Sequence, residues 1–172
     1  YICGFSPSEG MILIFKNGDS YHLVDSRYTE IAMQHAKESS LKVLEITKRF
    51  SEHVADIFNE HGAKSLVFEN ETISYSTYNA VKNAISSAEL VNLDNRLMLY
   101  RNRKEAEEIV FMKKANQIAE KSFLELLNDV KPGKTEKELA AEFEYIMAKN
   151  GSDGISFDTI LLSGAHTSMP HG

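Results

Sequence analysis

The chain has 172 residues and a formal net charge of -6 at pH 7, and this acidic balance argues against a nucleic-acid partner, because binding to phosphates needs a surplus of Lys and Arg. No apolar run approaches the roughly 18 residues that a membrane-spanning helix needs, which excludes an integral membrane protein. The single cysteine, Cys3, excludes a disulfide framework, and an unpaired thiol without a secretory leader favours a cytoplasmic location.

The first part of the chain alternates between runs typical of strands and amphipathic stretches typical of helices. Its Lys-Asn-Gly-Asp turn at 16–19 predicts a hairpin. We expect strands over residues 11–15, 20–25, 41–46, 65–69 and 89–93, and helices over residues 28–38, 50–61 and 76–86. This alternation predicts β-α-β units and a mainly parallel sheet that begins with the hairpin.

The pattern changes after about residue 93. One long helical pattern over residues 103–130 would measure roughly 40 Å at 1.5 Å per residue, which is too long for the small first domain. We therefore predict an α/β protein of two parts, with one domain over residues 1–97 and the start of a second domain over residues 98–172.

Residues that end or cap helices divide the second part. The Lys-Pro-Gly sequence at 131–133 ends the long helix, because Pro and Gly do not continue a helix. Thr135 and Glu138 form a capping box, which predicts a second helix up to about residue 149. The apolar run at 155–163 is expected to be a strand, followed by a loop.

Few residues indicate chemistry by their spacing alone. The Glu-His pairs at 52–53 and 60–61 lack the second histidine of a zinc motif, and we interpret both as solvated helical faces. Ser163 lacks the Gly-x-Ser-x-Gly frame of a nucleophile elbow, and Cys3 is interpreted as a buried or incidental thiol. His166 and His171 could shuttle protons from a loop, but spacing alone favours two exposed or locally bonded histidines.

Short motifs also stand in a fixed order through the second part. They are Arg101 and Lys104, Glu108-Ile109, Pro132-Gly133-x-Thr135-Glu136-x-x-Leu139-Ala140, Ser156-Phe157, Ser163-Gly164 and Pro170-His171-Gly172. In this order, residues 101–172 resemble the opening of the catalytic domain of the pita-bread metallopeptidases. The resemblance is to the branch of Xaa-Pro aminopeptidase and Xaa-Pro dipeptidase (prolidase).

Two motifs in the first part extend the resemblance. Residues 1–5 have the form Y-x-x-G-F and residues 25–29 the form D-x-R-Y-T; residues 1–95 thereby resemble the N-terminal domain of the same branch and of creatinase. The resemblance implies an N-terminal α/β domain with a mixed sheet, followed by the first part of a pita-bread α+β domain. We expect the chain to be an N-terminal fragment of a longer protein.

The resemblance implies that the parent protein is a homodimeric peptidase that cleaves the bond between an N-terminal residue and proline, in a dipeptide or a longer peptide. It further implies two divalent ions (Mn, Co or Zn) that activate a bridging water. The family's metal ligands, two aspartates, one histidine and two glutamates, lie downstream of the Pro-His-Gly segment. We therefore expect residues 1–172 alone to bind no catalytic metal and to cleave nothing.

Two residues receive roles from the resemblance. His171 matches the histidine that lies at a strand end beside the substrate, which implies a hydrogen bond to the substrate and stabilisation of charge at the scissile carbonyl. Phe157 would line the substrate pocket, with plain core packing as the alternative. Two other functions stay open: a non-catalytic relative that binds a peptide or protein, and a creatinase-like hydrolase that acts on a small guanidino compound.

Overall fold

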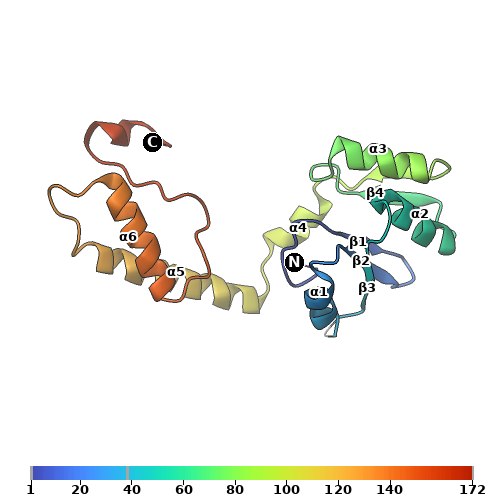
Figure 1. The fold of residues 1–172 in the computed structure, drawn as a ribbon, viewed down its shortest axis with the longest axis horizontal. Coiled ribbons are helices and arrows are strands. Elements are labelled where there is room, and N and C mark those ends of the chain that lie inside the picture. The colour runs from blue at the N-terminus through green and yellow to red at the C-terminus, as the bar shows by residue number, and fades with distance from the viewer. Residues whose placement is uncertain (1, 38, 172) are drawn as a thin grey trace. The chain divides into compact units, whose positions relative to one another are not determined.

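The computed structural model describes residues 2–37 and 39–171, which divide between residues 98 and 99 into two compact units. The first unit contains β1 (Met11–Ile14), β2 (Ser20–Val24), α1 (Thr29–Ala36), β3 (Leu41–Glu45), α2 (Phe50–Glu60), β4 (Ser65–Phe68), α3 (Tyr75–Ala84) and β5 (Glu89–Asn92) (Figure 1). After α4 (Arg96–Asn102) come α5 (Ala106–Leu126), α6 (Glu136–Lys149) and the short 3-10 helix η1 (Gly164–Ser168). Among the described residues, none of the helices combines the length and the apolar character that crossing a lipid bilayer requires.

The strands of the first unit form a mixed sheet and a separate pair. In the order β1-β2-β3, β1 runs antiparallel and β3 parallel to β2, while β4 pairs in parallel with β5. The predicted α/β class with a mixed sheet is confirmed. The expectation of one sheet is wrong for the described residues, because no backbone ladder joins the three strands to the other two.

The hairpin between β1 and β2 closes as its sequence predicts. Gly18 has a φ of 94°, a conformation that residues with a Cβ atom rarely adopt. The Asn17 Oδ1 atom accepts from the Asp19 amide at 3.1 Å, and the Phe15 amide donates to the Asp19 carbonyl at 2.9 Å. The turn therefore fixes the register in which Met11 lies opposite Leu23.

Both motifs of the N-terminal resemblance lie around α1. Gly4 has a φ of 78°, and a Cβ atom there would lie 2.7 Å from His35 Nδ1, so a larger residue would clash. Asp25 accepts from the Arg27 amide at 2.8 Å and forms an ion pair with the Arg27 guanidinium, which shapes the turn into α1. Tyr1, the first residue of the Y-x-x-G-F motif, and Glu38, where α1 was expected to end, lie outside the described residues.

The core of the first unit lies between the three-stranded sheet and two helices. Leu23 is fully buried in β2, the central strand. The buried side chains that cluster with it are Leu13, Tyr21, Val54, Ile57, Phe58, Val81 and Ile85. The apolar stripes expected on the helices at 50–61 and 76–86 thus form one core with the hairpin.

His61 does not lie on a solvated helical face as expected. Its side chain is 13% exposed, its ring stacks on Phe15 with centroids 3.9 Å apart, and its Nε2 atom shares a 2.8 Å hydrogen bond with the Tyr21 hydroxyl. The expectation was wrong because His61 caps the end of α2 within reach of Phe15 and Tyr21 in the hairpin. His53 also has a partner, since its Nε2 atom accepts from the Thr47 amide.

The long helix expected over residues 103–130 is present as one helix, α5, which is shorter than predicted and covers Ala106–Leu126. A separate helix, α4, precedes it, and residues 103–105 between the two are not helical. Glu105 is the N-cap of α5, and its amide donates to Glu108 Oε2 at 2.8 Å. Arg101 on α4 reaches the same carboxylate through both terminal nitrogens, at 3.1 and 2.5 Å. With 21 residues, α5 is roughly 31 Å long.

Helices α5 and α6 pack against each other in the second unit. Leu126, Leu139 and Ile146 form its buried apolar cluster. The predicted capping box is present, because the Glu138 amide donates to Thr135 Oγ1 at 3.2 Å and the Thr135 amide donates to Glu138 Oε2 at 2.8 Å.

The expected strand over residues 155–163 is absent from the structure. This segment has no regular secondary structure, and no described strand lies alongside it to exchange backbone hydrogen bonds. An apolar run becomes a strand only where a partner strand satisfies its backbone groups. The loop expected after it contains η1.

Truncating the fully buried Leu23 tests the position of the first core. We expect Leu23→Ala to lower the free energy of unfolding by about 3 kcal/mol, since it removes buried methyl groups and leaves a cavity. Ile14→Ala, on the adjacent strand and 61% exposed, should cost less than about 1 kcal/mol. Chemical denaturation measures both values, and equal losses in the two variants would contradict this assignment.

The pair of Arg101 and Glu108 makes stability depend on pH. The Arg101 guanidinium, together with the Glu105 amide, lowers the pKa of Glu108 from 4.5 to about 2. The stability that this carboxylate contributes is therefore complete above pH 4.5 and is lost as the pH falls toward 2. We expect the free energy of unfolding of Glu108→Gln to fall less steeply over this range. Glu107→Gln, a control on the exposed neighbour, should keep the wild-type slope; equal slopes in all three proteins would contradict the prediction.

Candidate functional site

The end of α6 is held on α5 by a buried hydrogen bond. Asn150 Nδ2 donates to Ser122 Oγ at 3.0 Å, and Ser122 is fully buried. Glu125 receives Lys149 Nζ at 3.4 Å, and hydrogen bonds from Asn150 and Lys149 lower the pKa of its carboxyl. These contacts therefore fix the position at which the segment after residue 150 begins.

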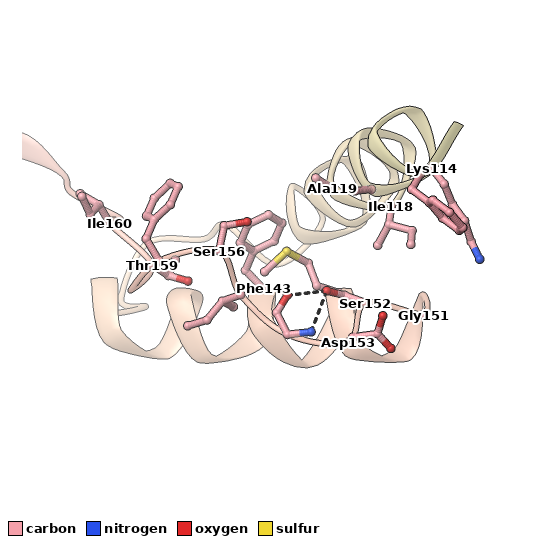
Figure 2. A pocket seen from close by; sticks show the side chains of 16 residues that line it. Lys114, Ile118, Ala119, Phe143, Gly151, Ser152, Asp153, Ser156, Thr159 and Ile160 are labelled. Atoms are coloured by element: carbon pink, nitrogen blue, oxygen red, sulfur yellow. Dashed lines mark hydrogen bonds between the residues drawn. The ribbon is translucent and has the colours of Figure 1, made fainter. Parts of the chain in front are cut away.

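That segment and the two helices line a mainly apolar hollow of about 700 Å³ that is open to solvent. Figure 2 shows Ile118 and Ala119 of α5, Phe143 of α6, and Thr159 and Ile160 of the segment around it. The polar side chains in the lining are Lys114, Ser152, Asp153, Ser156 and Thr159. The hollow can therefore take an apolar group, with charges of both signs in its wall.

Phe157 belongs to the lining of this hollow. Its side chain is 72% exposed, so it is not packed into a core within the described residues. It lies on an irregular segment rather than on the strand that we expected. Its predicted role in substrate binding is untested by this geometry.

Three polar side chains meet where α6 begins. Both the backbone amide and the hydroxyl of Ser163 donate to Glu136 Oε1, at 2.6 and 3.1 Å. His166 Nδ1 lies 3.1 Å from Glu136 Oε2. The contact with His166 and the donors of Ser163 lower the pKa of the Glu136 carboxyl. Because an ionised carboxylate only accepts hydrogen bonds, His166 carries its proton on Nδ1 in this arrangement.

His171 lies in an exposed turn after η1. It makes no hydrogen bond, ion pair or ring contact with another described residue, and it does not line the hollow that contains Phe157. The described residues therefore do not join the two predicted site residues into one site. Gly172, the last residue of the Pro-His-Gly motif, lies outside the described residues.

The described part of the chain does not form a metal centre. It contains no group of three or more His, Cys, Asp or Glu side chains that could hold an ion. The pair of Glu136 and His166 offers one carboxylate and one imidazole, and the carboxylate is already bound to Ser163. These residues do not fit a dinuclear site.

Glu136 is the residue that sequence reasoning missed. In the sequence it belongs to the motif at 132–140 and stands between the two members of the capping box, Thr135 and Glu138, but no pattern predicts a partner for it. Ser163 was considered as a nucleophile, and His166 received no role. The contacts of Glu136 span 27 and 30 residues, and no local pattern indicates a pairing over such a distance.

Two families match the chain in succession. Residues 1–104 match the Creatinase/Prolidase N-terminal domain, and residues 110–172 match metallopeptidase family M24. The predicted fold, an N-terminal domain of this type followed by the start of a pita-bread domain, is confirmed by these matches and by the solved structure described next.

Individual proteins resemble the chain along its whole length. A peptidase of Bacillus subtilis (strain 168), "Uncharacterized peptidase YqhT", is 36% identical, with 100% of the chain and 48% of that protein covered. An Xaa-Pro dipeptidase of Pyrococcus horikoshii is 32% identical, with coverage of 100% and 47%. The crystal structure of an X-Pro aminopeptidase from Thermotoga maritima superimposes with a TM-score of 0.89 at 35% identity, with coverage of 100% and 48%. The chain thus spans about half the length of these relatives.

Proposed function

Because the chain belongs to the Creatinase/Prolidase N-terminal domain family and continues into metallopeptidase family M24, we propose that the whole protein is a metal-dependent peptidase that cleaves the bond before proline. The observation that carries this proposal is the likeness, over the full chain, to an Xaa-Pro dipeptidase and an X-Pro aminopeptidase. We place the boundary between its two domains near residue 98.

The proposed substrate is a dipeptide or a longer peptide with proline in second position. A proline imide has no N–H group and a nearly fixed φ, so a general protease cleft, which binds extended backbone through N–H groups, suits it poorly. A dedicated pocket suits it better. We propose that Phe157 contributes to this pocket, which its place in the wall of the apolar hollow supports.

His171 is the proposed catalytic residue of this chain. In the hydrolysis, a water oxygen bonds to the carbonyl carbon, the carbon–nitrogen bond breaks, and the proline nitrogen takes up a proton. An imidazole N–H that donates to the carbonyl oxygen stabilises the negative charge that develops there. The exposure of His171 and its freedom from contacts with other described residues support this role, since its ring is available to a substrate.

The proposed metals are two divalent ions, with Mn, Co and Zn as candidates. We infer that their ligands come from outside residues 1–172, because the family resemblance places them downstream of the Pro-His-Gly segment. Membership of a metallopeptidase family supports the use of divalent ions.

The proposal also includes assembly and location. We propose a homodimer, because the N-terminal domain resembles one that pairs subunits, and a cytoplasmic location, for which the unpaired thiol of Cys3 is the support. Exposed apolar side chains along α5, such as Val110 at 63% and Phe111 at 71%, support the view that the second unit is part of a larger domain, because isolated domains rarely leave such surface uncovered.

Activity of the full-length protein with Mn²⁺ tests the proposed function. We expect release of proline from an Xaa-Pro dipeptide or cleavage of an Xaa-Pro-peptide, and no turnover of creatine. His171→Ala should lower kcat by roughly a hundredfold, since removal of one donor to the developing oxyanion has that effect. His53→Ala, a control in the first unit, should leave kcat unchanged. Unchanged turnover in His171→Ala would remove the role of His171, and hydrolysis of creatine alone would identify the creatinase-like alternative.

Residues 1–172 by themselves provide a second test. We expect this chain, purified and supplied with Mn²⁺, to show neither Xaa-Pro hydrolysis nor metal binding by calorimetry, because the proposed ligands are absent from it. The full-length protein under the same conditions is the positive control. Measurable hydrolysis by the short chain would contradict the proposed location of the metal ligands.

A further inference from the structure

The carboxylate of Glu136 holds a segment that follows it in sequence by almost thirty residues. It receives three hydrogen-bond donors: the amide and the hydroxyl of Ser163 on one oxygen, and His166 Nδ1 on the other. Its side chain is 29% exposed. Since each oxygen is engaged by a different residue of the segment, the carboxylate restrains the segment at two points.

The start of α6 is a rigid base for this carboxylate. Glu136 is the first residue of the helix and lies inside the capping box, between Thr135 and Glu138. The N-terminus of a helix also favours a negative charge, because its unpaired amides carry partial positive charge. Glu136 is therefore both fixed in place and favoured in its ionised, accepting form.

The restrained segment is itself a closed turn. Ser163 precedes η1, in which Thr167 Oγ1 donates to the Gly164 carbonyl at 2.8 Å and Ser168 Oγ donates to the Ala165 carbonyl at 2.9 Å. The Met169 amide donates to the His166 carbonyl at 2.9 Å. A restraint applied at residues 163 and 166 is thus carried through the turn to its end.

His171 follows this turn after two residues, Met169 and Pro170. The ring of Pro170 fixes its own φ and restricts the conformation of Met169, so the link between η1 and His171 has few free torsions. The position of His171 consequently depends on that of η1, and the position of η1 depends on Glu136.

We propose that Glu136 is a positioning residue for His171: by binding Ser163 and His166 it fixes the turn that presents the His171 ring. This inference rests on the proposed function, in which His171 contacts the substrate. Glu136 itself touches neither substrate nor metal in this scheme.

A double-mutant cycle in the full-length protein tests the proposal. The variants are Glu136→Ala, His171→Ala and the two combined, with Glu144→Ala as the control, because Glu144 lies on the same helix and its side chain makes no hydrogen bond or ion pair with another described residue. Hydrogen–deuterium exchange in the peptide over residues 161–169 reports the restraint, and steady-state kinetics with an Xaa-Pro dipeptide and Mn²⁺ report its effect.

We expect faster exchange over residues 161–169 in Glu136→Ala than in the wild type or in Glu144→Ala. In the same variant kcat should fall by roughly tenfold or more with a smaller change in KM, since misplacement of a catalytic group by about 1 Å has effects of this size. In the His171→Ala background, the Glu136→Ala change should lower kcat less than about twofold, because two residues that act as one unit are not additive.

Two results would overturn the inference. One is unchanged exchange over residues 161–169 in Glu136→Ala, which would show that the restraint does not exist, whatever the activity. The other is an equal loss of kcat with and without His171, which would show that Glu136 acts by another route. A wild-type protein without any Xaa-Pro hydrolysis would instead overturn the proposed function, and the exchange measurement would still decide whether Glu136 holds the turn.

Discussion

Strand β2 has backbone partners on both edges, β1 on one side and β3 on the other, and all five of its residues are buried. Because its amides and carbonyls are satisfied on both sides, the strand can lie in the interior of the first unit. Leu23 then anchors the core that includes Val54, Ile57 and Phe58 of α2. The arrangement of the first unit therefore depends on the pairing of this one strand.

The same requirement explains the irregular segment of the second unit. Residues 155–163 are apolar enough for a strand, but no described strand pairs with them. The segment is held at its ends instead, where Asn150 binds Ser122 and Ser163 binds Glu136. Side-chain hydrogen bonds from α5 and α6 thus take over the positioning that a sheet would otherwise provide.

This arrangement bears on the proposed chemistry. A peptidase needs its donor to the carbonyl oxygen in place before the substrate arrives, because a preorganised donor stabilises the developing charge without first having to move. Glu136 and the closed turn of η1 offer such preorganisation for His171. The apolar hollow with Phe157 lies between the helices and the irregular segment. The proposed substrate pocket and the proposed donor therefore lie at different places along one restrained stretch of chain.

Local signals in the sequence were sufficient for most elements of secondary structure. The Asn-Gly pair at residues 17–18, the capping box of Thr135 and Glu138, and the apolar stripe that contains Val54 each involve residues close in sequence, and the structure contains all three features. The family resemblance also came from motifs in their order along the chain, and the matching families confirm it. Local propensity and spacing decide such features because every interacting group lies within a few residues.

Contacts between distant residues were decided by the tertiary structure alone. The ring of His61 was predicted to be solvated, yet it stacks on Phe15, 46 positions earlier in the sequence. The helical pattern over residues 103–130 did not predict that Arg101 and the Glu105 amide would share the Glu108 carboxylate. The pairing of Glu136 with Ser163 and His166 could not be predicted from the sequence either. A carboxylate on a helix has many possible donors, and only folding brings one set of donors within hydrogen-bond distance. The sequence by itself determined the elements and the family, whereas the three-dimensional packing decided which polar groups became partners.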